Sequence, residues 1–220
     1  MCGIAGIMTR DGAPPDPARL HAMQAALAHR GPDGHAVLMR GDVGLVHLRL
    51  AIVDLANGVQ PLFAPGGTAL IANAEIYNDP DLRRAMPEVP FRTRSDCEPA
   101  AFLAEQHGAA FAERLRGMYA IAAHDPRAGR LLLARDPFGI KPLYYCEAEA
   151  AFAFASEPQA LLAAGFGARA VAPRAMAELL QLKFTSGAET IFPGIRRGAT
   201  ARAPKPAASR ACGSEAKANE

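Results

Sequence analysis

Alternating hydrophobic and polar positions predict that much of the chain folds into short strands. Period-two patterns and short apolar runs indicate strands over residues 3–8, 44–55, 69–77, 117–125, 130–136, 143–145 and 151–155. In the second of these, Val46, Leu48, Leu50 and Ile52 share one face, and His47, Arg49 and Ala51 share the other. Arg49 therefore projects from the face opposite the apolar one, where a plain solvated position is the simplest explanation of a strand arginine.

The strand over 69–77 is nearly all apolar, and its exceptions are Asn73 and Glu75. Alternation places both side chains on one face. Polar groups in a buried strand are costly unless they have partners or a function, so both residues are candidates for a site.

Helix signals occur between the strands. Asp16 suits an N-cap and Pro17 a first helical position, and the apolar spacing of Leu20, Met23 and Leu27 predicts a helix that ends by Gly31. Three further helices are expected: one opened by a Ser95–Glu98 capping box, one capped by Ser156 and ending near Gly165, and one from Pro173 to about Lys183. Asp96 would lie at a helix N-terminus, where the helix dipole favours an anion, and simple capping explains it equally well.

Successive strands with grouped helices predict an α+β fold with antiparallel sheets. The segment 198–220 has no Leu, Ile, Val or aromatic residue, so we expect a disordered tail there.

Composition narrows the class of protein. A net charge of +2 over 220 residues gives no indication of nucleic-acid binding, and no apolar run is long enough to cross a bilayer. No secretory signal is apparent. The cysteines are Cys2, Cys97, Cys146 and Cys212, which are too scattered for a metal cluster or a disulfide framework. We therefore expect a cytoplasmic protein without a metal site.

The chain starts Met1-Cys2-Gly3-Ile4-Ala5-Gly6. If Met1 is removed, Cys2 carries both a thiol and the free terminal amine. That amine has a reference pKa of about 8 and can accept the thiol proton without a separate histidine. A small buried cysteine at the start of a strand is the alternative interpretation.

Eight landmarks, in order over about 195 residues, resemble the glutaminase domain of class II glutamine amidotransferases, most closely the asparagine synthetase (glutamine-hydrolysing) family. They are Met1–Gly6, Arg30–Gly34, Leu48–Asp54, Asn73–Asn78, Ser95–Glu98, Arg135–Tyr145, Ser156–Glu157 and Thr190–Arg196.

The resemblance implies an N-terminal-nucleophile hydrolase fold over residues 2–197, a four-layer sandwich with two stacked antiparallel sheets between helical layers. It implies that Cys2 attacks the glutamine side-chain amide to give a γ-glutamyl thioester and ammonia, and that water then releases glutamate. The Asn73 side chain and the Ala74 N–H would form the oxyanion hole. Arg49 would bind the α-carboxylate, and Asp96 with Glu75 the α-ammonium.

Two departures from the family pattern stand out. Ala74 replaces the usual glycine, which would strain the site if the backbone there needed a positive φ. The ATP-dependent synthetase domain is also missing, as in a truncated or frame-shifted product, so ATP and Mg²⁺ are implied only for that domain. The expected partners are glutamine and an ammonia-accepting synthetase domain in cis or in trans, and a homodimer is a further candidate assembly.

Two alternatives stay open at this point. The domain could serve another acceptor, such as a sugar, a purine precursor or a polysaccharide-cluster intermediate. It could also be a non-catalytic remnant that only binds glutamine or a partner.

Overall fold

Two antiparallel sheets form the centre of the molecule in the computed structural model, which describes residues 1–51 and 58–198. The strand orders are β10-β8-β9-β1-β3-β2 in the first sheet and β4-β5-β6-β7 in the second. The strands are β1 (Gly3–Thr9), β2 (Gly34–Arg40), β3 (Val43–Arg49), β4 (Leu62–Phe63), β5 (Ala69–Ile76), β6 (Gly117–Asp125), β7 (Arg130–Arg135), β8 (Tyr144–Glu147), β9 (Ala151–Ala155) and β10 (Ile195–Arg197).

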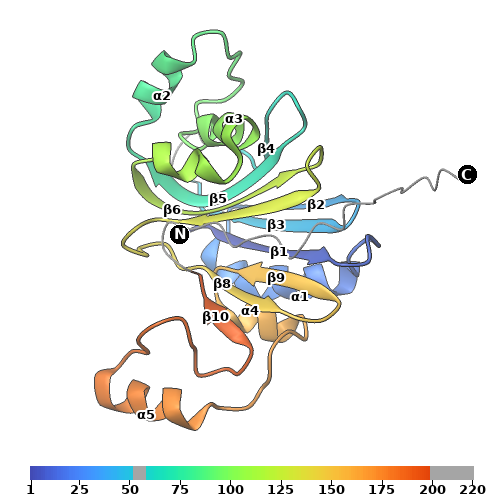
Figure 1. Ribbon diagram of the computed structural model, residues 1–220, viewed down its shortest axis with the longest axis vertical. Coiled ribbons are helices and arrows are strands. Elements are labelled where there is room, and N and C mark those ends of the chain that lie inside the picture. The colour runs from blue at the N-terminus through green and yellow to red at the C-terminus, as the bar shows by residue number, and fades with distance from the viewer. Residues whose placement is uncertain (52–57, 199–220) are drawn as a thin grey trace, which may run out of the picture.

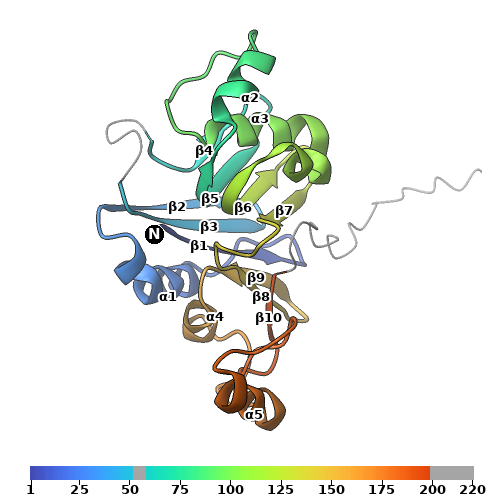
Figure 2. The same cartoon turned by 90° about the vertical axis from the view of Figure 1, so that its left-hand side faces the viewer.

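Helices cover the outer face of each sheet. The helices are α1 (Pro17–Leu27), α2 (Asp79–Ala85), α3 (Glu98–His107), α4 (Pro158–Ala163) and α5 (Pro173–Leu182), with 3₁₀ turns η1 (Ala28–Arg30) and η2 (Gly108–Arg114). The two sheets stack face to face, with α2 and α3 outside the four-stranded sheet and α1 and α4 outside the six-stranded one (Figures 1 and 2). The predicted α+β fold, with two stacked antiparallel sheets between helical layers, is confirmed.

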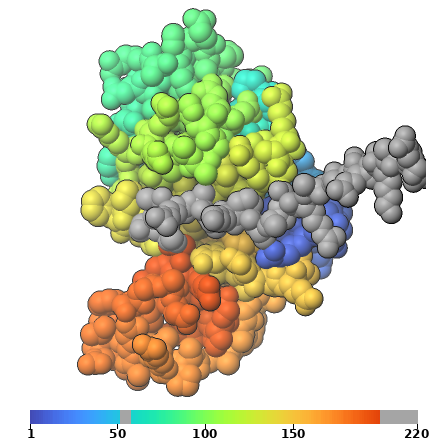
Figure 3. Space-filling model, viewed as in Figure 1, coloured from blue at the N-terminus to red at the C-terminus, as the bar shows by residue number. Residues whose placement is uncertain are grey.

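The segment that carries α5 and β10 forms the end of the molecule away from α2, shown orange to red in Figure 3. The predicted helix boundaries hold here: α5 begins at Pro173, and Lys183 ends it in the left-handed conformation with φ 68°.

Three hydrophobic layers follow from this stacking. In the outer layer of the six-stranded sheet, Leu20, Met23 and Leu27 of α1 are fully buried against strand residues such as Ala5 and Val46. Burial of each such large side chain stabilises the fold by about 1.5–3 kcal/mol. The Asp16 carboxylate accepts a hydrogen bond of 2.8 Å from the Ala18 N–H, so the predicted N-cap is confirmed.

Strand alternation decides which side chains enter the layer between the sheets. On β3, Val43 and Leu45 lie in that inner layer, whereas Val46 and Leu48 face α1. His47 therefore continues the inner face, and so does Arg49 at the end of the strand. The faces predicted for this strand are confirmed as far as Arg49, where β3 ends. The strand predicted over 44–55 is therefore too long, because Leu50 and Ala51 belong to no strand, and its residues 52–55 lie outside the described residues.

The same rule orients β5. Ala69 and Ile71 lie in the inner layer, whereas Leu70 and Ala72 pack under α3. The next odd-numbered positions, 73 and 75, therefore project toward the six-stranded sheet. The Ala74 methyl group points the other way and packs against the α3 layer.

Two predicted helix caps are wrong. Glu98 is the first residue of α3, and its carboxylate accepts hydrogen bonds from the Arg92 and Thr93 N–H groups at 2.7 and 2.8 Å. The carboxylate is thus used by the preceding loop and does not reach the Ser95 N–H, which donates to the Thr93 hydroxyl. Cys97 takes the N-cap position instead.

Ser156 does not cap α4 either. Its hydroxyl accepts a hydrogen bond of 3.0 Å from the Ile4 N–H, and its own N–H donates to the Ile4 carbonyl. Glu157 takes the N-cap position of α4. Ser156 therefore joins the end of β9 to β1 at Ile4, two residues after Cys2.

The expected tail over 198–220 lies outside the described residues except for Gly198. Within the described part of the chain, no helix is long and apolar enough to cross a membrane.

Candidate active site

Cys2 lies immediately before β1 and is held by hydrogen bonds on two sides. Its sulfur accepts a hydrogen bond from the Leu50 N–H at 3.3 Å and lies 3.6 Å from the Leu50 carbonyl oxygen. Its own carbonyl accepts a hydrogen bond of 3.0 Å from Nε of Arg30. The side chain is half-buried, so the sulfur is fixed without being sealed in an apolar interior.

The Arg30–Gly34 segment holds Cys2 in this position. Besides Cys2, Arg30 binds the Glu157 carboxylate at 2.5 Å. Burial tends to raise the pKa of Glu157, but hydrogen bonds from Arg30 and His29 outweigh this effect and the pKa is lowered. The Glu157 charge is therefore kept, and the segment is tied to the start of α4.

Gly31 brings the same segment against the end of β3. A Cβ atom at Gly31 would lie only 2.4 Å from the Leu48 carbonyl carbon and 2.5 Å from the Arg49 nitrogen. Beyond it, the Asp33 N–H donates to the Arg49 carbonyl at 3.0 Å, and the Asp33 carboxylate accepts from the Ala51 N–H at 2.8 Å. The segment thus fixes the strand end that carries Arg49.

Arg49 lies beside Cys2 across the β1–β3 pairing, because Gly3 is opposite Leu48 in an antiparallel register. Its side chain projects from the inner face of the six-stranded sheet and is partly buried. The predicted nucleophile and the predicted α-carboxylate ligand therefore lie on neighbouring strands.

Asn73 faces them from the other sheet. It is 2% exposed, and its side-chain nitrogen has no hydrogen-bond partner within residues 1–51 and 58–198. Buried side-chain donors are nearly always paired, so an unpaired one requires an explanation. A carbonyl or oxyanion from a substrate would supply the missing acceptor.

The Ala74 N–H is directed away from β6, toward the edge of the sheet, as the hydrogen bonds of the neighbouring residues demonstrate. On β5, the N–H groups of Ala72 and Ile76 both donate to side chains beyond the strand edge, to Gln60 and Asp96, each at 2.6 Å. Alternate residues of a strand direct their N–H groups to the same edge, so Ala74 directs its N–H there too.

The neighbouring strand gives the same result. Tyr119 lies opposite Ala74 on β6, and it exchanges hydrogen bonds with Asp136 on the side away from β5. Ala74 and Tyr119 are thus a non-hydrogen-bonded pair. β4 pairs with β5 at Leu70 and Ala69, and within residues 1–51 and 58–198 no strand covers the edge at Ala74.

The strain considered for Ala74 does not arise. Among the described residues, Lys183 is the one non-glycine residue with a positive φ, and Ala74 lies inside the regular strand β5. The N–H donor is therefore kept with ordinary strand geometry.

Asp96 and Glu75 lie near this edge in different environments. Asp96 is partly buried at the N-terminal side of α3, and its carboxylate accepts the Ile76 N–H; Glu75 is exposed. The Cys97 thiol contacts the other Asp96 oxygen at 3.6 Å. Burial raises the pKa of Cys97 well above its usual value, and Asp96 and, more weakly, Cys2 raise it further. Cys97 therefore stays a neutral thiol within electrostatic reach of Cys2.

The structure brings the six predicted residues to one region. Cys2 immediately precedes β1, and Arg49 ends β3. Both strands pack on β5, which carries Asn73, Ala74 and Glu75. Asp96 lies against the edge of β5 at Ile76. Within the described residues, no group of three or more His, Cys, Asp or Glu side chains could hold a metal ion.

His47 is a further polar residue of this region that the sequence did not single out. It is 2% exposed on the inner face of β3, and its Nε2 atom has no partner in the described part of the chain. Burial lowers the pKa of His47 to about 4; an interaction with the Ala72 backbone opposes this shift, and Arg49 adds to it. Its one sequence signal is a histidine on the same strand face as Arg49.

A separate groove of about 650 Å³ lies between the loop at Phe138 and Gly139 and the strand end at Arg197 and Gly198. Arg135 lines it, but its guanidinium donates to the carbonyls of Lys141, Gly198 and Gly139. Arg135 therefore closes the loop, and the groove is not part of the cysteine site.

Comparison with protein families decides the class of this domain. The family model described as "Glutamine amidotransferase domain" matches residues 1–209. The chain belongs to this family. Membership confirms the predicted glutamine amidotransferase domain and its place among the glutamine-hydrolysing amidotransferases.

Curated relatives of this amidotransferase domain include asparagine synthetases. The chain is 37% identical over 165 residues to asparagine synthetase [glutamine-hydrolyzing] 2 of Bacillus subtilis (strain 168), covering 73% of the chain and 22% of that protein. It is 41% identical over 146 residues to the asparagine synthetase of Asparagus officinalis, covering 66% and 25%. The chain thus spans about a quarter of the length of these relatives.

A solved structure shares the fold. The glutamine phosphoribosylpyrophosphate amidotransferase from B. subtilis, complexed with ADP and GMP, matches with a TM-score of 0.63 and 24% identity. The match covers 75% of the chain and 44% of that structure. This likeness supports the stacked-sheet architecture described above.

Proposed function

We propose that this amidotransferase domain hydrolyses the side-chain amide of glutamine through a thioester on Cys2. The observation that carries the proposal is the pair of donors on β5, the unpaired Asn73 side-chain nitrogen and the outward-directed Ala74 N–H. Two converging donors opposite a fixed thiol are the arrangement that acyl transfer requires.

In the proposed reaction the thiol proton passes to a base, and the sulfur attacks the amide carbon. The carbonyl oxygen becomes an oxyanion between Asn73 and Ala74. The carbon–nitrogen bond then breaks, the proton goes to the leaving nitrogen, and ammonia departs. Water attacks the remaining thioester, which releases glutamate and restores the thiol.

The base is the terminal amine of Cys2 itself, which requires that Met1 be removed. Met1 is 53% exposed and does not belong to the hydrophobic core, so its removal would leave the core intact. An amine next to the thiol needs no histidine, which agrees with the neutral, buried state of His47.

The free amino acid would be held by its two charges. Arg49 can bind the α-carboxylate through two parallel hydrogen bonds, and Asp96, with Glu75 at the rim, can bind the α-ammonium. The exposed position of Glu75 makes Asp96 the stronger of the two carboxylate ligands.

The ammonia would pass to an acceptor-activating domain, in cis in longer chains or in trans. The relatives' names favour activated aspartate as acceptor, with ATP and Mg²⁺ bound by that synthetase domain rather than by this one. A sugar or purine-precursor acceptor is the second candidate, because the amidotransferase with the similar fold acts in that kind of reaction by its name. We further propose a cytoplasmic location.

The test is a glutaminase assay on the purified chain, with and without a candidate synthetase, in which glutamate and ammonia are both measured. Equimolar release of the two products is expected. Cys2→Ala should abolish it and Cys97→Ala should leave it largely intact. A purified chain that binds glutamine without hydrolysing it would instead support a non-catalytic role.

A further inference from the structure

The segment between α2 and α3 determines where Asp96 lies. Residues 91–97 form no helix or strand, yet Asp96 within them must meet the β5 edge at the Ile76 N–H. The loop therefore needs support from other parts of the structure.

Arg83 on α2 supplies much of this support. Its Nη1 donates to the Thr93 carbonyl at 3.2 Å, and its Nη2 donates to the Ser95 carbonyl at 2.7 Å. Its guanidinium also lies over the Phe91 ring, 4.5 Å from the centroid. One planar cation thus contacts the loop at three places, and one of these, Ser95, directly precedes Asp96.

Two carboxylates hold Arg83 itself in place. The Asp79 carboxylate accepts a hydrogen bond of 2.8 Å from Nε one turn earlier on α2, and Glu98 lies 3.8 Å from Nη2. Glu98 is 3% exposed and also accepts from the Arg92 and Thr93 N–H groups. The loop is therefore fixed from α2 and from α3 at once.

The charges of this cluster interact with each other. Burial raises the pKa of Asp79, Arg83 lowers it, and Asp96 and Glu98 raise it again. Asp96 thus lies within electrostatic reach of the group that orients Arg83. If the guanidinium were removed, these carboxylates would repel each other without a cation between them.

We propose that Arg83 is a positioning residue for glutamine binding. Arg83 acts through the Thr93–Ser95 backbone and holds Asp96 where the substrate's α-ammonium binds. The proposal rests on the proposed glutaminase function and adds a residue that does not touch the substrate. Replacing the planar fork removes two hydrogen bonds to the loop at once, which a single point charge cannot fully restore.

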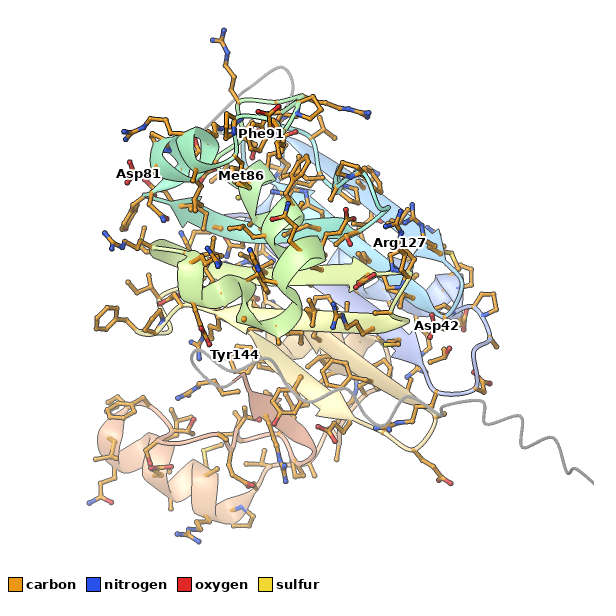
Figure 4. The ribbon with its side chains drawn as sticks, turned by 45° about the horizontal axis from the view of Figure 1, so that its top comes forward. Asp42, Asp81, Met86, Phe91, Arg127 and Tyr144 are labelled. Carbon is orange, nitrogen blue, oxygen red and sulfur yellow. The ribbon has the colours of Figure 1, made fainter. Side chains whose placement is uncertain are left out.

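The neighbouring Arg84 is a matched control. Its side chain is 78% exposed and pairs with Asp81, which is 66% exposed. In Figure 4, Asp81 lies at the outer side of α2, whereas Met86 and Phe91 mark the side of the Arg83 loop. Arg84→Gln removes the same charge from the same helix without touching that loop.

The experiment compares Arg83→Gln and Arg84→Gln with two substrates, glutamine and glutaramate, the analogue that lacks the α-amino group. For Arg83→Gln we expect KM for glutamine to rise about tenfold, which corresponds to the loss of one charge-assisted hydrogen bond. Its kinetic constants for glutaramate should match the wild type. Arg84→Gln should match the wild type with both substrates.

Arg83→Lys guards against a folding defect, because it keeps the charge beside Asp79 and Glu98. It should show the same substrate-dependent loss to a smaller degree. In an Asp96→Asn background, Arg83→Gln should add almost nothing, as expected for residues that act as one unit.

An equal loss with both substrates, or a lower melting temperature with unchanged KM, would overturn the positioning role. If the wild type hydrolyses neither substrate, the proposed glutaminase function fails instead, and the same variants are then compared for glutamine binding by calorimetry. Weaker binding by Arg83→Gln alone would still support the role, and equal binding by both variants would overturn it.

Discussion

The Asp96 carboxylate accepts a hydrogen bond of 2.6 Å from the Ile76 N–H, two residues along the open edge of β5 from the Ala74 N–H. A single strand edge therefore presents both a carboxylate for the substrate's ammonium group and a donor for its reacting carbonyl. Any shift of this edge would change recognition and catalysis together.

Asn73 provides the first test of the oxyanion hole. Asn73→Ala should lower kcat by about 10²–10³, because one of two donors to the oxyanion is lost. KM should change little, since the amide donor matters most in the transition state. Steady-state kinetics with glutamine give both constants, and an unchanged kcat would remove Asn73 from the oxyanion hole.

Ala74 is tested by a pair of substitutions. Ala74→Gly keeps the N–H and should leave kcat within about twofold, because the wild-type backbone is unstrained there. Ala74→Pro removes the N–H at an edge position where proline is tolerated, and should lower kcat as strongly as Asn73→Ala. A large gain of activity in the glycine variant would indicate that the site needs a positive φ at this position.

Arg49→Lys tests the α-carboxylate ligand. A planar fork is replaced by a point charge, so KM for glutamine should rise about tenfold while kcat changes less. Arg196→Lys, on the exposed face of β10, is the control and should leave both constants as they are. Wild-type KM in the Arg49 variant would contradict the assignment.

His47 predicts how stability depends on pH. Its pKa is lowered from 6.5 to about 4 in the folded state, so the unfolded chain binds the proton more readily between these values. The contribution of His47 to the free energy of unfolding is therefore constant above about pH 6.5. It falls as the pH is lowered toward 4, by up to about 3 kcal/mol.

Urea unfolding at several pH values measures this effect. His47→Phe should flatten the loss between pH 6.5 and 4, whereas His35→Phe, on the exposed side of β2, should not. Equal slopes for the wild type and the His47 variant would show that this histidine does not titrate as described.

The sequence predicted the strands that bury apolar side chains and missed those that do not. β5 and β6 are apolar runs in the middle of a sheet, and alternation predicted them. β2 lies at a sheet edge with alternate residues exposed, and α2 buries only Leu82, so neither gave a clear pattern.

The residues of the site could be named from motifs, but their directions could not. The outward Ala74 N–H follows from its pairing with Tyr119, which lies 45 residues further along the chain. The roles of Glu98 and Arg83 likewise depend on the loop that separates α2 from α3. A contact between strands so far apart in the chain leaves no local pattern. The capping box at Ser95 failed for a local reason, because the Glu98 carboxylate binds the Arg92 and Thr93 N–H groups of the preceding loop instead.

The most direct test of the central claim is to trap the covalent intermediate. The chain is mixed with glutamine, quenched in acid and mapped by mass spectrometry. We predict a γ-glutamyl group on Cys2, in an N-terminal peptide that lacks Met1. A γ-glutamyl group on Cys97, Cys146 or Cys212, or full activity in a chain that retains Met1, would contradict the account.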